Sequence, residues 1–248
     1  MTDAAAPWVS SLDPRARQRL LCLPFAGGGT APFRALREAL PGTVDLCPVA
    51  LPGRERRLSE PAHDDMDSLV EALVSGLLPA IRRVPYALYG HSMGAWVAFE
   101  LVRALRRLRR PLPTHLFVAA RRAPHLPSER PPLSHLPRQA FIDGVQERYD
   151  AIPEALLTQP GILDLFLPTL RADFQLLDAY RYRDGAPLPV PITALVGTGD
   201  AVVSARDVRA WREHTEAAFS FVRIDGGHFF LADHADEVGE LLGQRMSR

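Results

Sequence analysis

Hydrophobic and polar positions along the chain follow two alternating patterns. Short apolar runs, which are typical of buried strands, lie at 20–25, 44–50, 85–90, 115–120, 190–196 and 219–224. Between them apolar positions recur every three to four residues, a pattern that predicts helices near 31–40, 66–83, 94–108, 204–214 and 232–245. Strands that alternate with helices predict an α/β fold with a mainly parallel central sheet and helices on both faces.

The segment 124–186 breaks this alternation. It starts with proline-rich turns and continues with helical stretches at 139–149 and 161–180, without a strand pattern. Roughly sixty residues between two strands are far more than a usual connection. We therefore expect 124–186 to be a functional helical insertion within a single domain that spans 1–248.

Charge and composition narrow the class of protein. The 29 basic residues are all arginine and balance 29 acidic residues, so nothing indicates a nucleic-acid or membrane partner. Cys22 and Cys47 lie in apolar runs and are expected to be buried, reduced thiols. The N-terminal stretch lacks a basic start followed by an apolar core, and no apolar run has the length of a bilayer span. We therefore expect a cytoplasmic enzyme.

The stretch Y-A-L-Y-G-H-S-M-G-A-W at 86–96 carries the strongest chemical signal. Ser92 stands between Gly90 and Gly94, where a predicted strand gives way to a predicted helix. Glycines on both sides of a serine allow the sharp strand-to-helix turn of a nucleophile elbow. A serine that only caps the helix is the alternative interpretation, so the decision depends on a base and an acid elsewhere in the chain.

Two glycine-containing turns after later strands supply these partners. His228 lies in I-D-G-G-H-F-F after the last predicted strand, and Asp200 lies in V-G-T-G-D after the strand before it. A serine nucleophile needs a base, and the base needs an orienting acid. The order Ser92, Asp200, His228 is that of α/β-hydrolases. Weaker alternatives are His234 as the base and Asp225 or Asp184 as the acid.

A glycine-rich loop, L-P-F-A-G-G-G-T at 23–30, follows the first predicted strand. In this fold such a loop donates one N–H to the oxyanion, and the residue after the nucleophile, here Met93, donates the other. A phosphate-binding loop is the competing interpretation. The glycine spacing does not fit a dinucleotide fingerprint, and the chain has no lysine for a Walker motif.

These motifs resemble those of the type II thioesterases that accompany polyketide and nonribosomal peptide synthases. The resemblance rests on segments whose order and spacing cover Leu20 to Leu242: L-P-F-A-G-G at 23–28, L-P-G-R-E at 51–55, Y-G-H-S-M-G-A at 89–95, G-T-G-D-A-V-V at 197–203 and G-G-H-F-F-L at 226–231. It implies an α/β-hydrolase fold and hydrolysis of acyl groups from the phosphopantetheine of acyl or peptidyl carrier proteins, which clears stalled or misloaded chains.

The resemblance also implies roles for single residues. Ser92 would be the nucleophile, His228 the general base and acid, and Asp200 the orienting carboxylate. The N–H groups of Met93 and Ala26 would bind the oxyanion, and the insertion would be a lid over the acyl pocket. Neither a cofactor nor a metal is expected. The apolar side chains expected to bind the acyl group are Phe25, Phe141, Phe166, Phe174 and Phe229.

Arginine clusters at 54–57 and 103–110 are candidates for docking a carrier protein, because carrier proteins are usually acidic. Solvated surface charge explains both clusters equally well. Two other functions stay open on the residues alone. One is a general serine esterase or lipase, because a triad does not specify the leaving group. The other is a carrier-binding module without catalytic activity.

Overall fold

The computed structural model describes residues 7–10, 12–128 and 130–247. Its strands form one six-stranded parallel sheet in the order β2-β1-β3-β4-β5-β6. Their bounds are Gln18–Leu23 for β1, Val44–Pro48 for β2, Tyr86–His91 for β3, His115–Ala119 for β4, Ile192–Gly197 for β5 and Phe219–Ile224 for β6. The predicted parallel α/β architecture is confirmed, and each predicted strand lies within two residues of an observed one.

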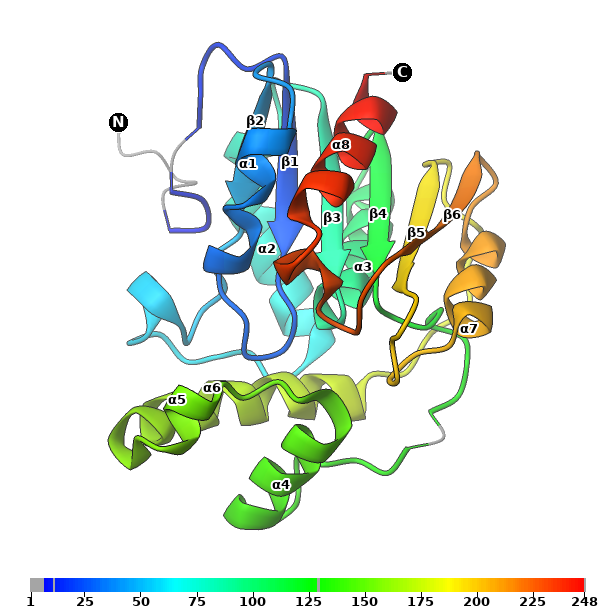
Figure 1. Ribbon diagram of the computed structural model, residues 1–248. Coiled ribbons are helices and arrows are strands. Elements are labelled where there is room, and N and C mark those ends of the chain that lie inside the picture. The colour runs from blue at the N-terminus through cyan, green and yellow to red at the C-terminus, as the bar shows by residue number, and fades with distance from the viewer. Residues whose placement is uncertain (1–6, 11, 129, 248) are drawn as a thin grey trace.

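Helices cover both faces of the sheet (Figure 1), and alternate side chains of the strands pack against one helical layer or the other. Leu21 and Leu23 of β1 pack with α2 (Met66–Ile81) and α3 (Met93–Arg107). Leu20 and Cys22 point to the other face and pack with α1 (Leu36–Ala39) and α8 (Ala235–Met246). This two-residue alternation follows from strand geometry and explains why the central strands appear as continuous apolar runs in the sequence.

Two predicted helices are broken in the structure. Residues 31–40 form a 3₁₀ turn, η1 (Ala31–Phe33), followed by the four-residue α1, and 204–214 form α7 (Ala205–Arg209) followed by the 3₁₀ helix η3 (Ala210–His214). Around η1, hydrogen bonds connect to the third residue back, as from the Arg34 N–H to the Ala31 carbonyl. Pro32 lies within this turn and offers no N–H for an α-helical bond. Two further short 3₁₀ helices are η2 (Glu55–Arg57) and η4 (Phe230–Ala232).

The helical insertion between β4 and β5 contains α4 (Arg138–Tyr149), α5 (Glu154–Leu157) and α6 (Pro160–Ala179). Figure 1 shows these helices across the carboxyl ends of the strands. The insertion has a small apolar core of its own, whose buried members are Leu133, Phe141, Ile142, Val145, Ile152, Leu163, Leu167, Leu170 and Phe174. It therefore covers the edge of the sheet where the loops carrying Ser92, Asp200 and His228 meet.

Both cysteines are buried and free, as the sequence predicts. Burial raises the pKa of the Cys22 thiol well above its ordinary value and also raises the pKa of Cys47. No helix in the described part of the chain has both the length and the apolar character needed to cross a bilayer.

Candidate active site

Ser92 occupies a strained turn between β3 and α3. Its backbone has φ 51° and ψ −112°, which is rare for a residue with a side chain. A Cβ on Gly90 would lie 2.1 Å from the Gly94 carbonyl oxygen, and a Cβ on Gly94 would lie 2.1 Å from the carbonyl oxygen of Leu23. Both glycines are therefore required sterically, because β1, β3 and α3 approach too closely at this turn for any side chain.

The three residues predicted as a triad lie in one hydrogen-bonded chain. His228 Nε2 lies 3.0 Å from Ser92 Oγ, and His228 Nδ1 lies 3.0 Å from Asp200 Oδ2. Because a carboxylate only accepts, the imidazole proton belongs on Nδ1, which leaves Nε2 to accept from the serine hydroxyl. The His228 side chain is 4% exposed and that of Asp200 is fully buried, so little water competes with this chain.

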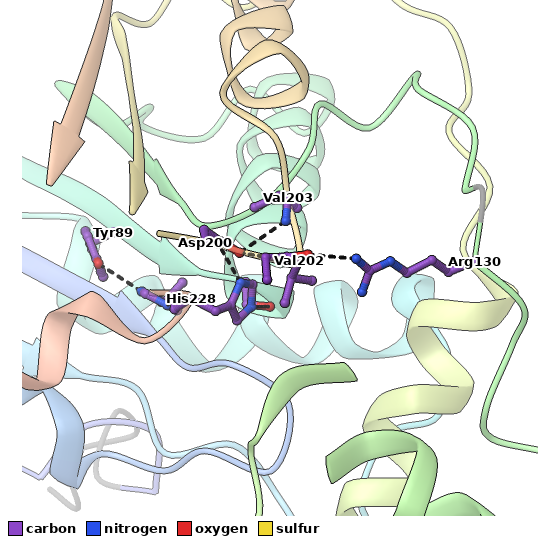
Figure 2. A network of polar contacts seen from close by, with 9 residues as sticks. Tyr89, Arg130, Asp200, Val202, Val203 and His228 are labelled. Carbon is purple, nitrogen blue, oxygen red and sulfur yellow. Dashed lines mark hydrogen bonds and ion pairs between the residues drawn. The ribbon is translucent and has the colours of Figure 1, made fainter. Parts of the chain in front are cut away.

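The Asp200 carboxylate is itself held in place. Its Oδ1 accepts the N–H groups of Val202 at 2.7 Å and Val203 at 3.1 Å, which leaves Oδ2 for His228, as Figure 2 shows. The loops of the acid and the base pack closely, because a Cβ on Gly197 would lie 2.3 Å from the Gly227 carbonyl oxygen. The glycines noted in the sequence thus bring the two loops into contact.

The alternative acids and base are placed elsewhere. The Asp225 carboxylate accepts from the Thr198 hydroxyl and the Gly226 N–H. Asp184 is exposed in the segment after α6, and His234 occupies the N-cap position of α8 without a side-chain capping hydrogen bond.

His91 has a structural role in the site that the sequence did not indicate. Its Nε2 donates to the main-chain carbonyl of His228 at 2.8 Å, and its Nδ1 accepts from the Tyr89 hydroxyl at 3.1 Å. Burial, followed by the neighbouring imidazole of His228, lowers the pKa of His91 to about 3. His91 is therefore neutral at ordinary pH, and its hydrogen bond holds the main chain of His228, whose imidazole contacts Ser92. Its position next to Ser92 was the available signal.

The loop 25–28, which we call the oxyanion loop, forms a tight turn at the end of β1. The Gly28 N–H donates to the Phe25 carbonyl at 2.9 Å, and Gly27 has φ 72°, as a type II turn requires at its third position. The Gly27 N–H donates to the Asp173 carboxylate at 2.7 Å. Among the N–H groups of Ala26, Gly27 and Gly28, only that of Ala26 has no acceptor in the described part of the chain.

Met93 is the first residue of α3, and first-turn N–H groups have no partner within their own helix. The positive end of the helix dipole also lies there. The N–H groups of Met93 and Ala26 thus belong to two turns that lie against each other. Gly94, in the turn that follows Ser92, packs on the carbonyl of Leu23, which immediately precedes the oxyanion loop.

The five predicted acyl-binding phenylalanines fall into two groups. Phe25 and Phe229 are half-buried and in contact, with ring centroids 4.8 Å apart, and Phe229 stacks near His91. Phe166 of α6 lies against Gly27. In contrast, Phe141 and Phe174 are buried in the core of the insertion, with centroids 5.5 Å apart.

The proposed docking role of the first arginine cluster is wrong for two of its three arginines. The guanidinium of Arg54 is buried and makes a bidentate ion pair with Asp173, at 2.8 and 2.9 Å. Arg57 is also buried and bonds to Glu60 and to the Ala50 carbonyl. Only Arg56 is exposed. Both buried guanidiniums serve internal contacts and are not available to a partner.

The described residues contain no group of three or more His, Cys, Asp or Glu side chains arranged to hold a metal ion. The groups that the structure brings together at the site are the Ser92 hydroxyl, the His228 imidazole and the Asp200 carboxylate, next to free main-chain N–H groups.

Comparison with known proteins agrees with this geometry. A family model for the thioesterase domain matches residues 18–246. The gramicidin S biosynthesis protein GrsT of Aneurinibacillus migulanus is 35% identical over 237 residues, covering 96% of this chain and 92% of GrsT. Among solved structures, RedJ, a thioesterase from the prodiginine pathway of Streptomyces coelicolor, is 36% identical with a TM-score of 0.84, covering 93% of this chain and 86% of RedJ.

The type II thioesterase BorB from the borrelidin cluster is 31% identical with a TM-score of 0.84, covering 100% of this chain and 98% of BorB. The sequence match to GrsT and the structural matches to RedJ and BorB each extend over nearly the whole of this chain. The chain therefore belongs to the thioesterase family, the hydrolases of acyl thioesters, and within it groups with the type II thioesterases of the α/β-hydrolase fold.

Proposed function

We propose that this thioesterase removes acyl groups from the phosphopantetheine arm of acyl and peptidyl carrier proteins, and so clears stalled or misloaded polyketide or nonribosomal peptide synthases. The observation that carries the proposal is the hydrogen-bonded chain Ser92–His228–Asp200 at the end of the sheet that the insertion covers. The biosynthetic roles of GrsT, RedJ and BorB support the assignment to assembly-line carriers.

In the acylation step, Ser92 Oγ attacks the thioester carbonyl carbon while His228 Nε2 takes the hydroxyl proton. The resulting imidazolium is stabilised by the Asp200 carboxylate on Nδ1, at 3.0 Å. The carbonyl oxygen becomes an oxyanion, to which the N–H groups of Met93 and Ala26 donate. Collapse of this tetrahedral intermediate breaks the carbon–sulfur bond, and His228 returns its proton to the departing thiolate.

The deacylation step repeats this sequence with water. Water attacks the carbonyl carbon of the Ser92 ester while His228 removes a proton from it, and a second oxyanion forms at the same N–H groups. Collapse of this intermediate breaks the bond between the acyl carbon and Ser92 Oγ, His228 returns the proton to that oxygen, and the free acid is released. The strained Ser92 backbone and the two flanking glycines hold the hydroxyl in position through both steps.

The helical insertion at 124–186 acts in this proposal as a lid, within a single domain of residues 1–248. Phe25, Phe166 and Phe229 line the acyl end of the site, because they lie half-buried around the oxyanion loop and His91. Phe141 and Phe174 contribute indirectly, by packing α4 against α6. We place the enzyme in the cytoplasm with its carrier-protein substrates.

The test is a panel of acyl groups presented in three forms: on a carrier protein, on N-acetylcysteamine and as an oxygen ester of a simple alcohol. The proposal predicts the highest kcat/KM for the carrier-bound thioester and loss of all activity in Ser92→Ala. A general esterase would hydrolyse the oxygen ester as well as either thioester. A carrier-binding module without activity would bind the acylated carrier but leave every substrate intact.

A further inference from the structure

The buried ion pair between Arg54 and Asp173 connects the helical insertion to the oxyanion loop. Asp173 lies on α6, whereas Arg54 lies in the loop after β2, and the side chains are 3% and 8% exposed. Removing two charges from water costs more than an isolated pair usually returns. Such a pair therefore calls for a role beyond stability.

The pair holds the oxyanion loop at two points. Asp173 Oδ2 accepts the Gly27 N–H at 2.7 Å while it also accepts from Arg54 Nη1 at 2.9 Å. The same Nη1 atom donates to the Gly28 carbonyl at 2.9 Å. The carboxylate thus orients the peptide between Ala26 and Gly27, and the guanidinium orients the peptide that follows Gly28.

The loop's own turn bond fixes the third peptide. The Phe25 carbonyl accepts from the Gly28 N–H. The Ala26 N–H belongs to the same trans peptide, so it points in the opposite direction to this carbonyl and stays free. Two of the three fixed peptides therefore depend on Arg54 and Asp173, and the orientation of the Ala26 N–H depends on all three.

One face of α6 makes the contact. Phe166, Leu170 and Asp173 are spaced four and three residues apart, so they lie on one side of the helix. A Cβ on Gly27 would lie 2.8 Å from both Phe166 and Leu170. Gly27, which has the left-handed backbone that the turn requires, is thus also the residue of the loop that α6 contacts.

We propose that Asp173 and Arg54 are positioning residues that orient the oxyanion loop, so that the oxyanion site is complete only when α6 of the insertion is docked on the body. This inference rests on the proposed function, because it assigns the Ala26 N–H to the oxyanion. It connects docking of the insertion to stabilisation of the transition state, and it gives Asp173 no contact with the substrate.

The test compares two ligands that share one acyl chain. A trifluoromethyl ketone analogue of the acyl pantetheine forms a tetrahedral adduct whose oxyanion needs the loop, whereas a thioether analogue binds without forming an oxyanion. Asp173→Asn puts an amide NH₂ donor among the donors Gly27 N–H and Arg54 and removes the charge that pairs with Arg54. Thr169→Val is the matched control, because Thr169 on the same helix bonds to the Gly53 carbonyl and not to the oxyanion loop.

For Asp173→Asn we expect kcat on an acyl N-acetylcysteamine thioester to fall by about tenfold or more, which is part of the value of one oxyanion donor. Affinity for the trifluoromethyl ketone should fall by a similar factor, and affinity for the thioether should stay within about threefold. Thr169→Val should keep all three values within about threefold of those of the parent enzyme.

Arg54→Lys gives a second readout, because it keeps the charge but loses the planar fork that reaches Asp173 and the Gly28 carbonyl together. We expect Arg54→Lys to lower the affinity for the trifluoromethyl ketone more than the affinity for the thioether, as Asp173→Asn does, but by a smaller factor. The inference is overturned if both variants weaken the two ligands equally, or weaken neither, because the pair would then serve only to dock α6. Failure of the parent enzyme to hydrolyse the thioester would instead refute the proposed function.

Discussion

The Nε2–H of His91 donates to the main-chain carbonyl oxygen of His228 across 2.8 Å. The residue that precedes the proposed nucleophile therefore holds the backbone of the proposed base. Because the Tyr89 hydroxyl occupies Nδ1, the tautomer of His91 is fixed, and the two loops that carry Ser92 and His228 are coupled by a neutral, buried imidazole.

Replacing His91 by phenylalanine should misplace the His228 imidazole. His91→Phe keeps an aromatic ring but leaves the His228 carbonyl and the Tyr89 hydroxyl without a partner. We expect kcat to fall by about ten- to hundredfold with little change in KM, because small errors in position are costly in a catalytic pair. His91→Gln retains an N–H donor and should recover most of the loss. Steady-state kinetics on one thioester checks both variants, and equal activity of His91→Phe and the parent would contradict this role.

Acid should destabilise the fold through its buried histidines. The pKa of His91 is about 3 in the folded state, below its ordinary 6.5, so the unfolded chain binds a proton first as the pH falls. This histidine therefore destabilises the fold below about pH 6.5, by about 2 kcal/mol at pH 5. Burial also lowers the pKa of His115 and His214, each to about 4, and both act in the same direction.

Urea unfolding at pH 8, 6 and 5 measures this effect. The free energy of unfolding should fall steadily from pH 6.5 downward in the parent and less steeply in His91→Gln. Identical unfolding midpoints at pH 8 and pH 5 in the parent would contradict it.

The glycines of the elbow should tolerate no substitution. Gly94→Ala places a Cβ 2.1 Å from the Leu23 carbonyl oxygen, so β1 and α3 must move apart. We expect a loss of about 2 kcal/mol or more in the free energy of unfolding, together with loss of activity. Gly42→Ala is the matched control, because nothing lies within 4 Å of the added carbon. Thermal melting and turnover should separate the two variants, and similar results for both would contradict the steric argument.

The kinetic effect of reversing the charge of an arginine should depend on whether that arginine is buried. Arg54→Glu sets two carboxylates against each other in a buried site, so we expect equal losses on carrier-bound and small thioesters. The cluster at 103–110 lies towards the C-terminal end of α3, about 20 Å from Ser92 at the N-terminus of that helix, so the exposed candidate near the site is Arg56. Reversal of the Arg56 charge should raise KM for the acylated carrier alone, with an effect that salt reduces. Kinetics on both substrates at two salt concentrations checks this. Equal losses on both substrates after reversal of the Arg56 charge would remove this arginine as a docking contact.

Local patterns predicted the sheet and the placement of the triad. Strand alternation and helical periodicity depend on nearby residues, and each triad residue stands in its own glycine turn at a strand end. Because Ser92, Asp200 and His228 each follow a strand of one parallel sheet, the sequence alone predicted that they lie at the same edge of that sheet. The divided helices at 31–40 and 204–214 were not predicted, because apolar spacing does not distinguish an α-helix from short 3₁₀ turns.

Contacts between distant residues account for the rest. Arg54 and Asp173 are 119 positions apart, and each resembles an ordinary surface charge in its local sequence. The burial of both follows only from the docking of α6 on the oxyanion loop, which no local pattern encodes. Similarly, the role of His91 depends on the backbone of His228, 137 positions away.

The covalent intermediate on Ser92 tests the central claim most directly. The enzyme should be mixed with an acyl-carrier thioester, quenched with acid within milliseconds and mapped by peptide mass spectrometry. Our account predicts an acyl group on the peptide that contains Ser92, formed and lost at rates consistent with turnover, and a fall in turnover of roughly a millionfold in Ser92→Ala. Turnover without acylation of that peptide, or substantial activity in Ser92→Ala, would contradict it.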